Sequence, residues 1–345
     1  MGGHAGRRAL TTRSGLDRLD EDDVRVRPGR GSRPRTRRRP GHEDAAEGFV
    51  AAVDRGRYRA LVGDHWVTAM RARELGRRGV VVGDRVALAG DTSGAPGTLA
   101  RVVRVEQRTT VLRRSADDAD PVERVIVANA SQLVIVSALA DPPPRPRLID
   151  RFLVAAFDAG LAPLLCLTKA DLAPAGELLA SYSPLGIPHV VLGRPLTAAR
   201  LDPLRHHLAD QISVLIGQSG VGKSTLVNAL IPDAARAVGT VSPVTGRGRH
   251  TSSSAVALPL PGGGWIIDTP GLRGFGLGHV APDRVVRAFG DLLPGTAACP
   301  PGCSHVEPDC ALEDWVRDQG SDPRLVARLD SLRRLLRSRE GGDTS

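Results

Sequence analysis

The feature that most constrains this chain is the segment "IGQSGVGKST" at residues 216–225. Residues 217–224 match the pattern G-x-x-x-x-G-K-[ST], with the apolar run "ISVLIG" before them and the helix-forming "STLVNAL" after them. A strand, a glycine-rich loop and a helix in this order bind phosphate, because successive backbone N–H groups and the helix N-terminus point at the anion. An unrelated glycine-rich turn is the disfavoured alternative, and we expect an α/β sheet with this loop at its edge.

Within this phosphate loop the side chains have separate expected roles. Lys223 is expected to reach the β- and γ-phosphate oxygens, and the hydroxyl of Ser224 to ligate Mg²⁺. The complete set of predicted nucleotide contacts in the loop is Gly217, Gln218, Ser219, Gly220, Val221, Gly222, Lys223, Ser224 and Thr225.

A second motif lies upstream, in "LLCLTKADLAP" at residues 164–174. The carboxylate of Asp171 can accept hydrogen bonds from the N1 and N2 donors of guanine, which adenine lacks, while Lys169 lies along the base. A four-residue string alone is weak, and an exposed helix start is the alternative. Its position after the apolar run "PLLCL" favours base recognition by residues 168–171, namely Thr168, Lys169, Ala170 and Asp171.

The order of these two motifs indicates a circular permutation. Ordinary GTPases place the phosphate loop first and the base motif last, whereas in this chain the base motif comes first. Such a rotation preserves every contact when the chain ends of a domain lie close together.

Lysine usage supports both motifs. Of the 47 basic residues, 45 are arginine, and the two lysines are Lys169 and Lys223. A compact ammonium fits beneath a phosphate loop or along a base, where a forked guanidinium would clash.

The segment after the phosphate loop favours a GTP switch over a kinase or an ATPase. In "WIIDTPG", Asp268 ends a predicted strand and is expected to be linked to Mg²⁺, and the N–H of Gly271 is expected to meet the γ-phosphate. In "GRGRHTSSS" at 246–254, the hydroxyl of Thr251 is expected to complete the Mg²⁺ shell. Leu272 stands where Ras-like proteins carry a water-orienting glutamine, so His250 is the candidate catalytic residue. A histidine that only packs or touches RNA is the alternative.

Residues 46–114 contain short β-rich runs separated by Gly/Asp turns, such as "FVAAV", "YRALVG" and "TVLRR". Five or six such strands in about 65 residues predict a small barrel of the oligonucleotide-binding type. Its aromatic residues are few, so RNA contact would rest mainly on arginines, and a purely structural barrel is the alternative. The aromatic residues are Phe49, Tyr58 and Trp66, and the arginines are Arg57, Arg59, Arg71, Arg73, Arg77 and Arg78.

The C-terminal residues 291–345 contain the cluster "CPPGCSHVEPDC". Three thiolates and one imidazole predict a structural Zn²⁺ site with the ligands Cys299, Cys303, His305 and Cys310, and free cysteines are the alternative. Cys166 is more simply a buried strand residue. The segment 322–339 predicts a helix capped by Asp322, with a leucine stripe beneath a basic face.

Composition limits the remaining segments. The formal charge of +9 and the pI near 10.4 favour a polyanionic partner, and no apolar run approaches the length of a membrane span. Residues 1–45, with 12 arginines and 7 acids, predict a disordered basic arm that either contacts rRNA or only improves solubility. No secretory signal is visible, so we expect a cytoplasmic protein.

With these residues in place, the chain resembles the circularly permuted bacterial GTPases known as ribosome small-subunit-dependent GTPase A, over about residues 46–340. The resemblance implies a multidomain α/β protein: an OB-like barrel at 46–114, a permuted P-loop GTPase domain at 115–290 and a zinc-binding helical domain at 291–345. It also implies GTP and GDP as ligands, and the small ribosomal subunit and its rRNA as partners. The expected role is late maturation of that subunit, with GTP hydrolysis stimulated by the subunit. We expect GTP turnover to time the release of the protein itself from the subunit.

Two departures and two rivals accompany this resemblance. Thr168 stands where the family commonly has Asn, which predicts the loss of a side chain that ties the base motif to the phosphate loop. The run Thr251-Ser252-Ser253 leaves open which hydroxyl meets Mg²⁺. An RNA-binding scaffold with nucleotide as a conformational ligand is the rival function, and Asp171 disfavours a P-loop ATPase.

We expect a monomer without a membrane partner.

Overall fold

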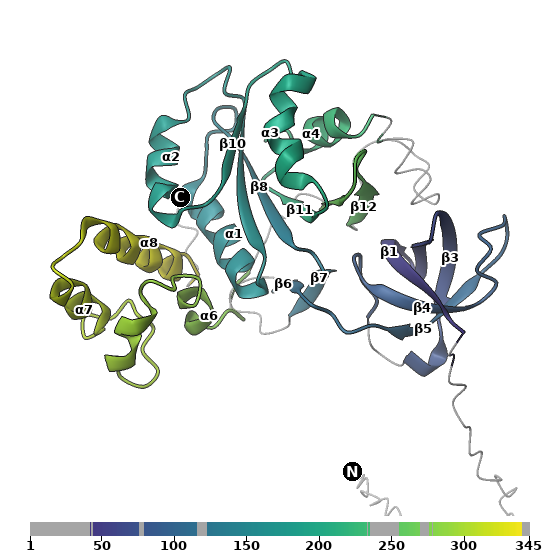
Figure 1. Ribbon diagram of the computed structural model, residues 1–345, viewed down its shortest axis with the longest axis horizontal. Coiled ribbons are helices and arrows are strands. Elements are labelled where there is room, and N and C mark those ends of the chain that lie inside the picture. The colour runs from purple at the N-terminus through teal and green to yellow at the C-terminus, as the bar shows by residue number, and fades with distance from the viewer. Residues whose placement is uncertain are drawn as a thin grey trace, which may run out of the picture. The chain divides into compact units, whose positions relative to one another are not determined.

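The computed structural model describes residues 42, 44–75, 79–115, 123–232, 234, 255–269, 276–277 and 279–339 (Figure 1). Eleven strands form one hydrogen-bonded sheet in the order β10-β9-β8-β11-β13-β12-β1-β2-β3-β5-β4. The first strand also pairs with β4, which closes the N-terminal five strands into a barrel. Within the described residues, no helix combines the length and the apolar character that crossing a membrane requires.

The barrel follows from alternating burial along its strands, since one side chain in two faces the interior. Val50, Ala60 and Val67 are fully buried at its centre, together with Leu88 and Val102. The expected run "TVLRR" is not a barrel strand: β6 pairs with β7 in a separate two-stranded sheet. The bounds are β1 Ala46–Asp54, β2 Arg57–Val62, β3 His65–Arg71, β4 Arg85–Gly90, β5 Ala100–Val105, β6 Val111–Arg114 and β7 Arg124–Ala128, with the 3-10 turn η2 at Arg73–Leu75.

The second part of the sheet is mostly parallel, as the continuous apolar runs predict. Strands β10, β9, β8, β11 and β13 are parallel neighbours, and β12 adds an antiparallel edge. Every residue of the central strand β8 is buried. The bounds are β8 Gln132–Ala138, β9 Ala162–Thr168, β10 His189–Leu192, β11 Ile212–Ile216, β12 Val256–Pro259 and β13 Trp265–Asp268.

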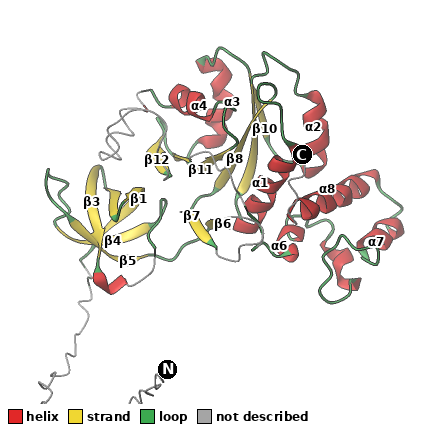
Figure 2. Ribbon diagram, turned by 180° about the vertical axis from the view of Figure 1, so that it is seen from behind, coloured by secondary structure: helices red, strands yellow, loops and turns green. Residues whose placement is uncertain are grey.

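Helices connect these parallel strands and pack along the sheet (Figure 2). In α1, Pro146 occupies the first turn and Gly160 ends the helix in the left-handed conformation, with φ of 69°. The inner face of α1 is apolar, because Phe152 and Ala155 are buried and Leu148 is half-buried. The bounds are α1 Pro146–Ala159, α2 Gly176–Tyr182, η3 Ser183–Leu185, α3 Ala198–Leu208 and α4 Lys223–Leu230.

The C-terminal region is helical, and its last helix, α8, packs against α1. The predicted cap is confirmed, because the N–H of Arg324 donates to Asp322 Oδ1 at 2.8 Å. The leucine stripe is also present: Leu329, Leu332 and Leu336 are buried and Leu325 is half-buried. The bounds are α6 Pro282–Val286, η5 Leu293–Ala298, α7 Leu312–Asp318 and α8 Pro323–Arg339.

An arginine of α8 reaches residues far upstream in the sequence. Arg328 donates to both carboxylate oxygens of Asp291 at 2.8 Å and lies 4.5 Å from the ring centroid of Phe289. It also donates to the carbonyls of Pro184 and Leu185 in η3. The predicted basic face of α8 is therefore partly an internal contact surface.

Candidate nucleotide site and metal centre

The phosphate loop follows β11 and leads directly into α4. At Gly217 a Cβ atom would lie 2.3 Å from the carbonyl oxygen of Val136 in β8, so the loop passes β8 at a distance that only glycine permits. Gly222 has φ of 96° at the start of α4, a conformation that other residues rarely adopt. Val221 is buried beneath the loop, while Ser219, Ser224 and Thr225 are exposed at its surface. The loop thus presents its polar groups outward, as phosphate binding requires.

Lys223 lies beneath its own loop. Its Nζ donates to the carbonyl oxygens of Gly217 at 2.6 Å and Gln218 at 3.0 Å. Burial lowers the pKa of Lys223, and the charge of Asp268 opposes this shift. Asp268 ends β13, which lies beside β11 in register with Leu215, so the carboxylate and the ammonium share one side of the site.

The base motif follows β9 at the same edge of the sheet. Since β8 separates β9 from β11 and all three run parallel, their carboxyl ends meet there. Thr168, at the end of β9, is buried, and its Oγ1 donates to the carbonyl oxygen of Val221 at 2.6 Å. The expected loss of the tie between the two motifs is therefore wrong: a threonine hydroxyl reaches the loop carbonyl directly.

Residues 141–143 link the same two motifs a second time. Lys169, in the left-handed conformation with φ of 59°, donates through Nζ to the carbonyl oxygen of Asp141. Gln218 Nε2 donates to the carbonyl oxygen of Pro143 at 3.4 Å. This loop follows β8, the strand between β9 and β11. Its main-chain carbonyls therefore accept hydrogen bonds from the lysine of the base motif and the glutamine of the phosphate loop.

Asp171 is held by the loop that follows β10. Its Oδ1 accepts the main-chain N–H of Arg194 at 2.8 Å, and its Oδ2 accepts Arg194 Nε at 3.3 Å. The N–H of Arg194 lowers the pKa of Asp171, which keeps the carboxylate ionised as a double acceptor at neutral pH. Ala170 N also donates to the carbonyl oxygen of Leu192 at 3.1 Å, which fixes the motif against β10.

Arg194 and the carbonyl of Asp141 were not among the contacts predicted from the sequence. The signal that points to them is positional, because ligand-contacting loops of parallel sheets follow the carboxyl ends of the strands. The loops after β8 and β10 flank the one after β9. His250, Thr251, Gly271 and Leu272 lie outside the described residues, so their expected roles stay predictions.

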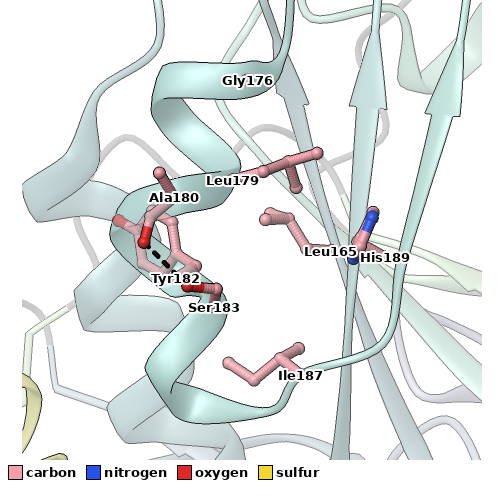
Figure 3. Close-up of a pocket in the computed structure, with 8 residues that line it drawn as sticks. All are labelled: Leu165, Gly176, Leu179, Ala180, Tyr182, Ser183, Ile187 and His189. Atoms are coloured by element: carbon pink, nitrogen blue, oxygen red, sulfur yellow. Dashed lines mark hydrogen bonds between the residues drawn. The ribbon is translucent and has the colours of Figure 1, made fainter. Parts of the chain in front are cut away.

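A cavity of about 250 Å³ lies between α2 and strands β9 and β10, and Figure 3 shows the side chains that line it. Its described lining is mainly apolar and contains none of the predicted nucleotide contacts: Leu165, Gly176, Leu179, Ala180, Tyr182, Ser183, Ile187 and His189. The cavity is therefore separate from the site formed by the two motifs.

The barrel aromatics are occupied by packing. Tyr58 is buried, the rings of Phe49 and Trp265 lie 4.6 Å apart, and Trp66 meets Trp265 edge-on at 6.4 Å. Arg59 is half-buried, donates to Thr68 at 2.9 Å and lies 5.9 Å from the Trp66 ring. Of the predicted RNA-contacting arginines, the exposed ones within the described residues are Arg57, Arg71 and Arg73, whereas Arg77 and Arg78 lie outside them.

The C-terminal cluster brings four potential metal ligands together. One ligand atom from each of Cys299, Cys303, His305 and Cys310 lies within 4.8 Å of the others. His305 Nδ1 is 3.6 Å from the sulfur of Cys299 and 3.8 Å from that of Cys310, and these two sulfurs are 3.9 Å apart. Tetrahedral Zn²⁺ would hold two sulfurs about 3.8 Å apart and a sulfur and a nitrogen about 3.6 Å apart.

Burial sets the protonation states of the cluster. It lowers the pKa of His305, so its imidazole is neutral at neutral pH, and it raises the pKa of the Cys303 and Cys310 thiols, so a bound metal would have to displace their protons. Burial likewise raises the pKa of Cys166, to about 12, which agrees with the prediction of a buried strand residue.

The fold and site define a class: a circularly permuted P-loop GTPase with an N-terminal barrel and a C-terminal cluster of metal-ligating residues. A family model described as RsgA GTPase matches residues 105–278. Curated proteins named small ribosomal subunit biogenesis GTPase RsgA are also similar. That of Chromohalobacter salexigens is 40% identical over 75% of each chain, and that of Gemmatimonas aurantiaca is 37% identical over 80% of this chain and 92% of its own.

Two solved structures share the fold. YjeQ from Thermotoga maritima superimposes with a TM-score of 0.59 at 24% identity, covering 84% of this chain and 98% of its own. YloQ, described as a circularly permuted GTPase, also gives 0.59, at 22% identity, covering 86% and 97%. The chain belongs to the RsgA GTPase family, and it is a GTP hydrolase.

The Thr168 tie predicts a measurable contribution to nucleotide binding. Thr168→Ala leaves the buried carbonyl of Val221 without its donor and frees the base motif from the phosphate loop. We expect GDP affinity to fall by about 1 kcal/mol, or roughly fivefold, as for one buried hydrogen bond. Titration of the protein with a fluorescent GDP analogue measures this loss. Thr168→Ser keeps the hydroxyl and is the matched control; equal losses in both variants would contradict a role for the hydrogen bond.

Proposed function

We propose that this GTPase acts in late maturation of the small ribosomal subunit, binds that subunit through its rRNA, and uses subunit-stimulated GTP hydrolysis to time its own release. The observation that carries the GTPase site is the hydrogen bond between Thr168 and Val221, which joins the base motif to the phosphate loop across β8. The names of the curated relatives support the subunit as partner.

In this proposal the nucleotide is read by residues from separate loops. Asp171 accepts the two guanine donors, Lys169 lies along the base, and Lys223 transfers its bonds from loop carbonyls to phosphate oxygens. Magnesium bound with GTP would neutralise developing phosphate charge, and Ser224, Thr251 and Asp268 are the residues proposed to hold or orient it. Gly271 is proposed to donate its N–H to the γ-phosphate.

The barrel is proposed to bind rRNA by charge instead of base stacking. Phe49, Tyr58 and Trp66 are engaged in packing, which removes the aromatic platform that sequence-tolerant RNA binding often uses. The net charge of +9 and the exposed Arg57 and Arg73 support contact with phosphates. Such binding weakens steeply with salt, because each neutralised phosphate releases counterions.

We further propose the domain boundaries 1–45, 46–114, 115–290 and 291–345, with a cytoplasmic, monomeric protein. The cluster at Cys299, Cys303, His305 and Cys310 is proposed to hold one structural Zn²⁺, supported by the donor set and its spacing. When bound, zinc supplies folding free energy to a segment with little core of its own.

The function is tested by single-turnover GTP hydrolysis with and without purified small ribosomal subunits. We expect a clear acceleration by the subunits in the wild type. In His250→Ala, we expect GTP affinity to be nearly unchanged while the stimulated rate falls by at least about tenfold, because the proposed role is to position water.

His206→Ala changes an exposed histidine of α3 and serves as the control for this test. An RNA-binding scaffold would show no stimulation in any variant. Equal loss of affinity and rate in His250→Ala would contradict a catalytic role and indicate a structural one.

Base recognition is tested by exchanging the acceptor at Asp171. In Asp171→Asn, the side-chain NH₂ opposes a guanine donor, so we expect GTP affinity to fall at least about tenfold. Xanthosine triphosphate offers a carbonyl in place of the 2-amino group and is expected to recover affinity. Binding is measured by calorimetry, with Asp202→Asn on α3 as the control. A variant that prefers GTP as strongly as the wild type does would show that the base is read elsewhere.

The metal is tested by elemental analysis of the purified protein. We expect about one equivalent of zinc per wild-type chain and loss of this zinc in Cys303→Ser. In that variant, hydrogen exchange is expected to speed up more over residues 291–320 than in the sheet. Cys166→Ala, which alters a cysteine outside the cluster, is expected to retain the zinc. A metal-free wild type with a normal exchange pattern would contradict the assignment.

A further inference from the structure

Arg194 contacts the base-reading carboxylate through two separate groups. Its main-chain N–H donates to Asp171 Oδ1 at 2.8 Å, and its side-chain Nε donates to Asp171 Oδ2 at 3.3 Å. One residue therefore binds both oxygens of one carboxylate, once from a fixed backbone position and once from a side chain. A carboxylate held at both oxygens has lost its freedom to rotate about χ2.

The loop that carries Arg194 is itself fixed in place. Arg200, at the start of α3, donates through Nη1 to the carbonyl oxygen of Arg194 at 2.9 Å. At Gly193 a Cβ atom would lie 3.2 Å from the main-chain nitrogen of Asp171, so this loop passes close to the base motif. Backbone and side-chain contacts together place Arg194 against Asp171.

The number of acceptor sites fits guanine. An ionised carboxylate has about four lone-pair sites, two on each oxygen. Arg194 uses one on each oxygen, which leaves one on each, and guanine presents two donors to this carboxylate. A residue that blocked the base would instead have to withdraw before guanine could bind.

From this geometry we propose that Arg194 is a positioning residue for guanine specificity: it orients the Asp171 carboxylate so that both oxygens face the base. The proposal rests on Asp171 reading guanine, as proposed above. It assigns to Arg194 a share of the preference for guanine over bases that lack the 2-amino group.

The experiment compares GTP with inosine triphosphate, which lacks the 2-amino donor. In Arg194→Met the main-chain N–H still binds Asp171 Oδ1, but the Nε contact with Oδ2 is lost. The carboxylate is then less well oriented, so we expect its hydrogen bond to the 2-amino group of guanine to weaken more than its bond to the N1 donor. We expect GTP affinity to fall about threefold, the size typical of one exposed ion pair, and the preference for GTP over inosine triphosphate to fall about twofold or more. Arg194→Lys retains a charged donor, so its GTP affinity and its preference for GTP are expected to lie between those of Arg194→Met and the wild type.

The matched control is Arg205→Met on α3, because Arg205 likewise binds an aspartate, Asp202, at 3.0 Å and a carbonyl, that of Ala198, at 3.2 Å. It should leave both affinities unchanged. A double-mutant cycle with Asp171→Asn adds a second readout: if Arg194 acts through Asp171, its effect on base preference disappears in that background.

Three outcomes would overturn the proposal. A rise in GTP affinity and in base preference on Arg194→Met would show that Arg194 competes with guanine for the carboxylate. Unchanged affinities for both nucleotides would make Arg194 an ordinary surface residue, and equal losses for both nucleotides would indicate a general effect on the loop. Failure of Asp171 itself is distinguishable, because then Asp171→Asn would keep the wild-type preference for GTP and would not accept xanthosine triphosphate.

Discussion

A single buried hydrogen bond, from the hydroxyl of Thr168 to the carbonyl of Val221, joins the two halves of the nucleotide site. It joins residues 53 positions apart in the chain, with the base motif preceding the phosphate loop. The bond is possible because β9 and β11 both pair in parallel with β8, so their carboxyl ends share one edge of the sheet. Function at this edge depends on the spatial order of strands, and chain order is free to rotate around it.

The same constraint explains why the site draws on loops from neighbouring strands. The loop after β8 supplies the carbonyls of Asp141 and Pro143, and the loop after β10 supplies Arg194. Each loop lies beside the base motif or the phosphate loop because its strand lies beside β9 or β11. Hydrogen bonds therefore connect each of these loops to the base motif or the phosphate loop.

The sequence was sufficient where a residue type determines its own role. The phosphate loop, the parallel sheet and the four clustered ligands could be predicted, because glycine spacing, apolar runs and a Cys/His pattern each have a local physical cause. It misled at Thr168, since the carbonyl of Val221 accepts from a hydroxyl as well as from an amide. Contacts between residues far apart in the sequence could not be predicted. The helical pattern places Arg328 on the basic, solvent-facing side of α8, yet this arginine donates to the carbonyl of Pro184, 144 residues earlier. No periodicity reveals such an acceptor, and Arg194 was missed for the same reason.

The two lysines connect these observations. In a chain with 45 arginines, a positive charge is elsewhere provided by a forked guanidinium, but at Lys169 and Lys223 the ammonium donates to main-chain carbonyls inside tight loops. Three donors on one small atom can satisfy such carbonyls and then turn toward a phosphate or lie along a base. A planar guanidinium fixes its donors in a fork, and the arginines of this chain bind carboxylates such as Asp171 and Asp291 as well as main-chain carbonyls such as that of Pro184. The two lysines thus lie in the loops that receive the nucleotide, whereas arginines hold those loops and the C-terminal helix in place.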